Sequence, residues 1–347
     1  MEPPLVPSRT IYRWDLDKTY LRTEFDTVRQ LLRTAVEKPA QKRTVPGASV
    51  LLREIRATGP AGIFILSGSP EQMRRVLEAK LRLDGIRWDA FTLKPSLRKL
   101  LRGKVRFLKD QISYKLAALL SARTGAEPDT REVLFGDDAE ADAFIYSLYA
   151  DLGAGRVGTE TLMKVLERAR VYRDEIPQLV RMASRIPRRD HVRRIFIHLD
   201  RMSAPEVFAE FGYRVCPFFN YFQPATVLYQ DGGVEVQAVL RVAADLVLRH
   251  GFGGEALAAS FFDLADRRYV GRDTAEGLLE AVGSADLRAF ASAAPSLEQM
   301  AGSIERRLPQ LGDPAPMERL PIDYVDLFSR DKARARAARR RATWRRH

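Results

Sequence analysis

The sequence predicts an α/β fold in which a mostly parallel sheet is covered by helices on both faces. Short apolar segments of strand length alternate with segments whose apolar residues recur at helical spacing, which is typical of βαβ units. The segment PAGIFILSGSP (60–70) is a continuous apolar run bounded by turn residues, as expected of a strand buried on both faces. Beyond about residue 232 the strand signals stop, so a C-terminal helical extension is expected.

The predicted elements can be placed in chain order. Strands are expected at residues 10–14, 60–70, 88–94, 131–138 and 192–200, with a further one at 213–218. Helices are expected between them at 25–38, 48–59, 70–82, 112–123 and 139–153, and after them at 234–250 and 254–270. Pro70 is placed as the first residue of its helix, because proline suits the first helical turn.

Four parts of the chain are predicted from these elements. Residues 1–230 form the α/β domain, 231–308 a helical extension, 309–330 a proline-rich linker or strap, and 331–347 a basic tail. With 347 residues the chain can bury a sizeable core.

The composition excludes several classes of protein. A single cysteine, Cys216, excludes a disulfide framework and a thiolate metal cluster. None of the four histidines has metal-ligand spacing, so a bound metal would be a hard cation held by carboxylates. The first twenty residues lack the apolar region of a secretory signal, and no apolar run approaches the roughly 18 residues of a membrane span. We therefore expect a soluble, cytoplasmic protein.

The formal net charge of +12 is concentrated in the tail 331–347, which has eight Lys or Arg residues and one Asp. Its arginines lie all round a helical wheel rather than on one stripe. A solvated extension, a contact with an anionic membrane surface and a contact with nucleic acid all remain open. Nucleic acid is the less favoured partner, because Trp344 is the only aromatic residue in the tail.

Asp15 and Asp17, in the segment WDLDKTYL (14–21), stand one residue apart directly after the first predicted strand. In extended backbone their carboxylates point the same way, and such a pair repels unless a cation or a shared proton relieves it. Ser67 stands near the end of the second predicted strand, Lys115 lies near the start of a predicted helix, and GDDAEAD (136–142) begins at the end of a later strand. Ligands bind at the carboxyl ends of parallel strands, so these segments are expected to form one site.

These motifs, in this order, resemble those of the haloacid dehalogenase superfamily of phosphohydrolases. The superfamily pattern is DxDx[TV], a Ser or Thr, a Lys and an acidic GDxxxxD-type turn. It is matched by the segment 15–19, Ser67, Lys115, and Gly136-Asp137 with Asp142. The resemblance covers about residues 9–230. It implies a Rossmann-like fold, and the short segments between motifs predict a small cap or none over an open site.

Within that superfamily, VLFGDDAEADAFIYSLYADL (133–152) looks most like the catalytic domain of actin-patch-associated phosphatidate phosphatases. "SGSP" resembles the second motif of those enzymes. The chain departs from their pattern at two positions: Lys18 replaces an acid of their DIDDT loop, and Asp138 replaces their usual Ser.

The resemblance implies a Mg²⁺ site and a role for each residue. Asp15 is expected to be the nucleophile that forms an aspartyl-phosphate, and Asp17 the general acid and base. Ser67 and Lys115 would donate to the phosphoryl oxygens. Asp15, the backbone carbonyl of Asp17, and Asp137 would hold Mg²⁺.

Alternative roles for these and neighbouring residues remain open. The supporting or alternative positions are Thr19, Gly68, Asp138 and Asp142. Asp138 and Asp142 also suit a helix N-cap and first turn. Lys94 and Lys109 compete with Lys115 for the lysine role, and for His198 a packed core position is favoured over one that faces the site.

The predicted function is Mg²⁺-dependent hydrolysis of a phosphomonoester, with a phosphatidate-like lipid as the substrate that the closer resemblance implies. Three alternatives remain. One is a small-molecule phosphatase whose C-terminal helices act as a lid, and another is a polynucleotide-end phosphatase that uses the basic tail. The third, a non-enzymatic binding module on the same fold, is disfavoured by the intact set of acids.

Overall fold

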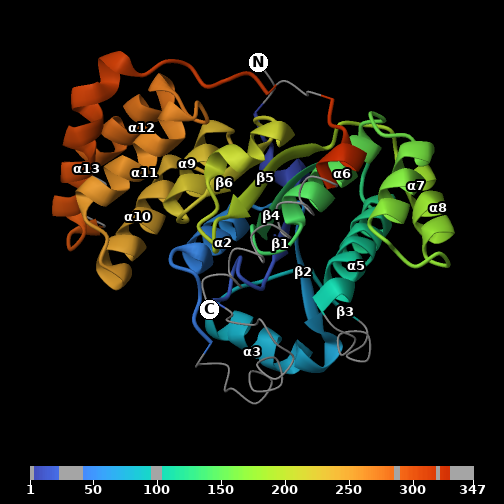
Figure 1. Cartoon of the computed structure of the whole chain (residues 1–347). Coiled ribbons are helices and arrows are strands. Elements are labelled where there is room, and N and C mark those ends of the chain that lie inside the picture. The colour runs from blue at the N-terminus through green and yellow to red at the C-terminus, as the bar shows by residue number, and fades with distance from the viewer. Residues whose placement is uncertain (1–3, 23–41, 95–103, 285–289, 318–320, 329–347) are drawn as a thin grey trace, which may run out of the picture.

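The computed structural model describes residues 4–22, 42–94, 104–284, 290–317 and 321–328. Six strands form one open sheet in the order β3-β2-β1-β4-β5-β6, and every neighbouring pair is parallel (Figure 1). The strands are β1 (Thr10–Asp15), β2 (Gly62–Pro70), β3 (Ala90–Lys94), β4 (Arg131–Asp137), β5 (Val192–His198) and β6 (Val215–Phe218). The predicted α/β class and parallel sheet are confirmed, including the strand expected at 213–218.

Both faces of the sheet are apolar, because side chains alternate along each strand and helices cover both sides. Trp14, Phe135 and Phe196 belong to one core cluster, in which the rings of Trp14 and Phe135 stack with centroids 3.7 Å apart. Leu134 and Ile195, their neighbours in sequence, belong to the cluster on the opposite face. Complete burial of each such side chain contributes about 1.5–3 kcal/mol to stability, so the central strands are held from both sides.

The helices divide between these two faces (Figure 1). One face is covered by α2 (Ala48–Ala57), α3 (Arg74–Leu83) and α9 (Phe222–Gln230). The helices α10 (Val236–His250), α11 (Gly254–Asp266), α12 (Arg272–Gly283) and α13 (Ala294–Arg307) continue the same core outward from α2 and α9. The other face is covered by α5 (Lys104–Thr124), α6 (Asp142–Gly153), α7 (Thr159–Arg168) and α8 (Ile176–Arg185).

The structure differs from the sequence-based prediction at three places. The helix expected at 112–123 is part of the longer α5, so Lys115 lies in the middle of this helix and not near its start. Pro70 does not begin a helix: it is the last residue of β2, pairs with Lys94 after an irregularity in the register, and is followed by a 3-10 turn before α3. Its φ of −71° and ψ of 151° are extended, a conformation that proline adopts as readily as the helical one. The helices α7 and α8 were not predicted. The helix expected at 25–38 and the basic tail 331–347 lie outside the described residues.

A helical segment at 324–328 lies on α6, on the opposite side of the molecule from α13 (Figure 1). The Tyr324 hydroxyl donates to Asp151 Oδ2 at 2.6 Å, and the Tyr324 ring meets Phe144 edge to face. Because Tyr324 and Leu327 are buried there, this part of the expected linker or strap contributes to the core beside α6.

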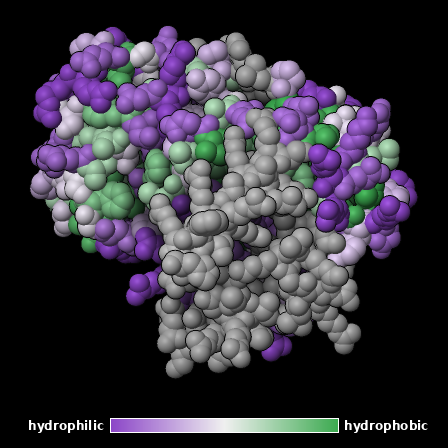
Figure 2. Space-filling model, viewed as in Figure 1, coloured by the Kyte–Doolittle hydropathy of each residue, from purple (hydrophilic) through white to green (hydrophobic). Residues whose placement is uncertain are grey.

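The outer surface of the described helices is mixed in polarity. Figure 2 shows hydrophilic residues over α7 and α8 and a paler, more apolar area toward α10 and α11. Among these helices, none combines the length and the apolar character that crossing a membrane requires.

Candidate active site

The site lies where the strand order changes direction. The strands β2 and β3 lie on one side of β1 within the sheet. The chain then crosses over, so that β4 lies on the other side of β1. The loops that follow β1 and β4 therefore separate, and an open parallel sheet binds its ligands in the crevice at this point. Asp15 is the last residue of β1 and Asp137 is the last residue of β4, so both carboxylates stand at the mouth of that crevice.

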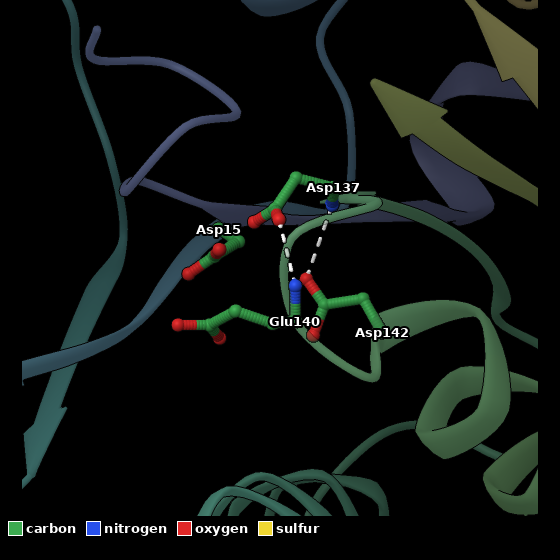
Figure 3. A group of neighbouring side chains, drawn as sticks. All are labelled: Asp15, Asp137, Glu140 and Asp142. Atoms are coloured by element: carbon green, nitrogen blue, oxygen red, sulfur yellow. Dashed lines mark hydrogen bonds between the residues drawn. The ribbon is translucent and has the colours of Figure 1, made fainter. Parts of the chain in front are cut away.

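Four carboxylates converge there (Figure 3). Asp15, Asp137, Glu140 and Asp142 each offer an oxygen atom, and these atoms lie within 4.8 Å of one another. Asp15, Asp137 and Asp142 are buried, and Glu140 is nearly so. Such proximity of buried like charges is costly unless cations or protons offset it.

The turn after β4 sets the directions of these acids. The backbone N–H groups of Ala139 and Glu140 donate to Asp137 Oδ1 at 2.6 and 3.0 Å, which closes a tight turn around that oxygen. Asp142, in the first turn of α6, accepts the Asp137 N–H through Oδ2 at 3.2 Å. A Cβ atom at Gly136 would collide with the Asp142 carboxylate, so a glycine is required at that position.

Lys115 provides a positive charge at the centre of the cluster. Its Nζ lies 2.5 Å from Asp142 Oδ1, 2.7 Å from Glu140 Oε2 and 3.5 Å from Asp15 Oδ2, and its side chain is fully buried. Burial alone would lower the pKa of Lys115, but the surrounding carboxylates raise it well above its usual value. Lys115 is therefore charged, and its single positive charge faces the excess negative charge of the cluster.

The imbalance leaves carboxylate oxygens that suit a cation. In the described part of the chain, both Asp15 oxygens and Asp137 Oδ2 are buried and accept no hydrogen bond. Burial and the neighbouring acids raise the pKa values of Asp15 and Asp137. A hard divalent cation held by carboxylates, such as Mg²⁺, would satisfy these oxygens and offset the excess negative charge. The residues present thus fit the metal that the sequence motifs imply.

Asp17 lies beside this cluster and is held by the end of β2. The hydroxyls of Ser67 and Ser69 donate to Asp17 Oδ2 at 3.0 and 2.7 Å, and the Ser69 N–H donates to Ser67 Oγ at 3.0 Å. Burial raises the pKa of Asp17, although the two serine hydroxyls act in the opposite direction. A carboxyl group with a raised pKa is suited to carry a proton between groups.

The structure separates the two adjacent acids Asp137 and Asp138. The Asp138 carboxylate accepts the N–H groups of Arg201 and Ser203 at 2.8 and 3.1 Å, so it ties down the loop after β5. It is not part of the four-carboxylate cluster. Neither Asp138 nor Asp142 is the N-cap of α6, a position that Ala141 occupies. Asp142 lies in the first turn of that helix, as expected, and its carboxylate contacts Lys115.

The remaining predicted residues lie near the same loops. Thr19 is fully buried, and within the described residues its hydroxyl makes no hydrogen bond. Gly68 lies against α5: a Cβ there would be 2.6 Å from Gln111 Nε2. Of the competing lysines, Lys94 is buried at the end of β3, and the Lys109 side chain lies outside the described residues.

Two contributors were not among the predicted site residues. Glu140 joins the acids, and Gln111 Nε2 donates to Glu140 Oε1 at 2.9 Å. Ser69 joins Ser67 at Asp17. Both Glu140 and Ser69 lie inside motifs that were recognised, GDDAEAD and SGSP, but their side-chain directions depend on the turns that follow the strands.

A comparison with known protein families finds a match over part of the chain. The family model described as phosphatidate phosphatase APP1, catalytic domain, matches residues 14–159. The matched segment contains every residue of the acidic cluster as well as Asp17, Ser67, Ser69 and Lys115. The predicted resemblance to phosphatidate phosphatase catalytic domains is confirmed over this part of the chain. Searches of curated proteins and of solved structures gave no match.

Proposed function

We propose that this protein is a Mg²⁺-dependent phosphomonoester hydrolase of the haloacid dehalogenase type that acts on a phosphatidate-like lipid. The observation that carries the proposal is the buried group of four carboxylates at the switch point of the sheet, in which both Asp15 oxygens and Asp137 Oδ2 accept no hydrogen bond from any described residue. The family match over residues 14–159 supports a phosphatidate-like substrate.

In the proposed reaction, a carboxylate oxygen of Asp15 attacks phosphorus as the bond to the leaving oxygen breaks, and Asp17 gives that oxygen a proton. The products of this step are an aspartyl-phosphate and the free alcohol, here a diacylglycerol. Asp17 then takes a proton from water as the water attacks the aspartyl-phosphate, which releases inorganic phosphate and restores Asp15. The hydrogen bonds from Ser67 and Ser69 hold Asp17 beside Asp15 for both steps.

We propose that Asp15, the backbone carbonyl of Asp17, and Asp137 hold Mg²⁺, and that Glu140 and Asp142 complete the acidic surroundings. When bound, the cation would offset the charge of the approaching phosphate and of the carboxylates. Lys115 would keep Asp15 and Asp142 close together and stabilise negative charge on the phosphoryl oxygens.

A panel of substrates tests the proposal. Phosphate release should be measured from phosphatidate in mixed micelles, sugar phosphates, nucleotides, phosphopeptides and oligonucleotides with a terminal phosphate. We expect phosphatidate to be hydrolysed fastest, with activity lost on chelation and restored by Mg²⁺. A preference for oligonucleotide ends or for small sugar phosphates would replace the lipid assignment by one of these alternatives. Full activity in chelator would contradict the metal site.

The neighbouring acids Asp137 and Asp138 provide a matched pair of variants. Asp137→Asn removes a proposed metal ligand, so we expect the Mg²⁺ concentration for half-maximal activity to rise at least about tenfold, a loss of about 1.4 kcal/mol in binding. Asp138→Asn changes the same charge one residue away and should leave this concentration unchanged, because Asp138 holds the loop at 201–203. Magnesium titration of both variants is the measurement. Equal effects would contradict the assignment of Asp137.

The basic tail is relevant to how the protein would reach a lipid substrate. Eight basic residues near an anionic membrane surface would each contribute roughly 1 kcal/mol to binding. We propose that the tail favours association with anionic lipid, with nucleic acid as the second candidate partner.

A further inference from the structure

The loop that carries the two central aspartates has an unusual backbone. Between Asp15 and Leu21 the chain turns back on itself, with the N–H groups of Tyr20 and Leu21 both donating to Leu16 O and the Lys18 N–H donating to Leu21 O. Lys18 has a φ of +62°, in the left-handed region that is unfavourable for a residue with a side chain. Such a conformation persists only where surrounding contacts hold it.

Two of these contacts come from far along the chain. The ring of His198, at the end of β5, places Nδ1 2.6 Å from Lys18 O. The hydroxyl of Tyr221, the residue before α9, donates to Thr19 O at 2.8 Å. Two consecutive carbonyls of the loop are thus held by side chains about 180 and 200 residues away.

The chemistry of the groups defines the direction of each bond. A carbonyl oxygen can only accept, so His198 carries its proton on Nδ1. Burial lowers the pKa of His198, and its ring lies among the rings of Phe218 and Tyr221. The Tyr221 hydroxyl is likewise buried, within the aromatic core that includes Trp14. Both donors are therefore anchored in the packed core rather than on a surface loop.

We infer that His198 and Tyr221 are positioning residues for the loop 15–21, and that the catalytic unit therefore extends beyond residue 159 to at least α9. The inference rests on the proposed roles of Asp15 and Asp17. By holding the carbonyls of Lys18 and Thr19, the two side chains place Asp17 relative to Asp15. An offset of about 1 Å between reacting groups can cost on the order of 100-fold in rate, so this placement affects turnover rather than substrate binding.

The chain offers a matched control for each residue. His191 precedes the other end of β5 and is also a buried histidine whose Nδ1 lies near a carbonyl, Arg189 O at 3.0 Å. Tyr269 is also a buried tyrosine that donates to a carbonyl, Val215 O at 2.6 Å. Neither contacts the loop 15–21 through these bonds. His198→Leu is thus paired with His191→Leu, and Tyr221→Phe with Tyr269→Phe.

The first measurement is hydrogen exchange of the amides in residues 15–21 of the full-length protein. Loss of one loop bond should speed this exchange about tenfold in His198→Leu and in Tyr221→Phe, while the two controls should match the wild type in this segment. His198→Asn, whose side-chain amide can donate from nearly the same position, should restore slow exchange. Unchanged exchange in both loop variants would overturn the inference, as would equal changes in the controls.

The second measurement is the separation of kcat from KM with a soluble aryl phosphate. We expect kcat to fall about 10- to 100-fold in the two loop variants with KM nearly unchanged, and to recover in His198→Asn. A fall in the melting temperature without a fall in kcat would show a purely structural role. Should the wild type release no phosphate from any substrate, the proposed function fails, whereas the exchange result still decides whether His198 and Tyr221 position the loop.

Discussion

Replacing Asp15 by Asn is expected to lower phosphate release by on the order of 10⁴-fold or more, to background, while the fold remains intact. The substitution keeps the size of the side chain and removes the charge that attacks phosphorus. Its structural cost is small, because within the described chain the Asp15 oxygens accept no hydrogen bond and the only ion pair is with Lys115 at 3.5 Å. Removing one of four clustered carboxylates should also reduce their mutual repulsion.

Two measurements check this expectation together. Phosphate release from an aryl phosphate should vanish in Asp15→Asn, and the midpoint of urea unfolding in chelator should be equal to or higher than that of the wild type. Mass spectrometry must exclude deamidation of the introduced asparagine back to aspartate. Activity that persists in the intact amide variant would remove Asp15 from the role of nucleophile, and a lower midpoint would show that its charge supports the fold.

Replacing Lys115 by Met should cause the largest loss of stability among the site residues. The lysine is fully buried against Asp142, Glu140 and Asp15, and its removal leaves these acids without their cation. Breaking a buried ion pair by removing one partner costs about 3–5 kcal/mol. The loss should be greatest in chelator and smaller with Mg²⁺ present, because a bound cation would replace part of the missing charge.

Lys80 serves as the control for this substitution. It also pairs with an acid in a mostly buried setting, Asp84 at 2.7 Å, but Asp84 additionally accepts hydrogen bonds from Tyr20 and Thr44. Lys80→Met should therefore cost only about 1 kcal/mol. The measurement is urea unfolding of both single variants and of the double variant that combines Lys115→Met with Asp142→Asn. The double variant should regain part of the stability that Lys115→Met loses. Equal losses at both lysines would contradict the special role of Lys115.

Much of the fold and of the site was predictable because it depends on local signals. A strand buried on both faces needs a continuous apolar run, and 60–70 has one wherever its partners lie. Asp15, Ser67 and Asp137 were predicted to lie together because polar residues at the ends of such strands must meet at one edge of a parallel sheet. The structure places Asp15 and Asp137 together there with Lys115, as expected from the motifs.

Other features could not be predicted because a side-chain direction in a turn depends on bonds formed after the strand ends. Asp137 and Asp138 are adjacent in the sequence, yet one points into the cluster and the other to the loop at 201–203. Glu140 enters the cluster because the turn closes on Asp137 Oδ1. No periodicity or motif spacing specifies these directions.

The amino-acid sequence alone predicted the class of fold, the ends of the strands and the kinds of chemical group at the candidate site. These features follow from the hydrophobic pattern and from residue type. How these groups are held depends on the folded arrangement. His198 was interpreted as a packed core residue, and it is packed, but its ring also bonds to the loop between Asp17 and Thr19. That contact joins positions 180 residues apart, and it exists because β5 lies beside β4 and β4 beside β1 in the folded sheet. The local sequence around either residue does not predict a contact between positions so far apart in the chain.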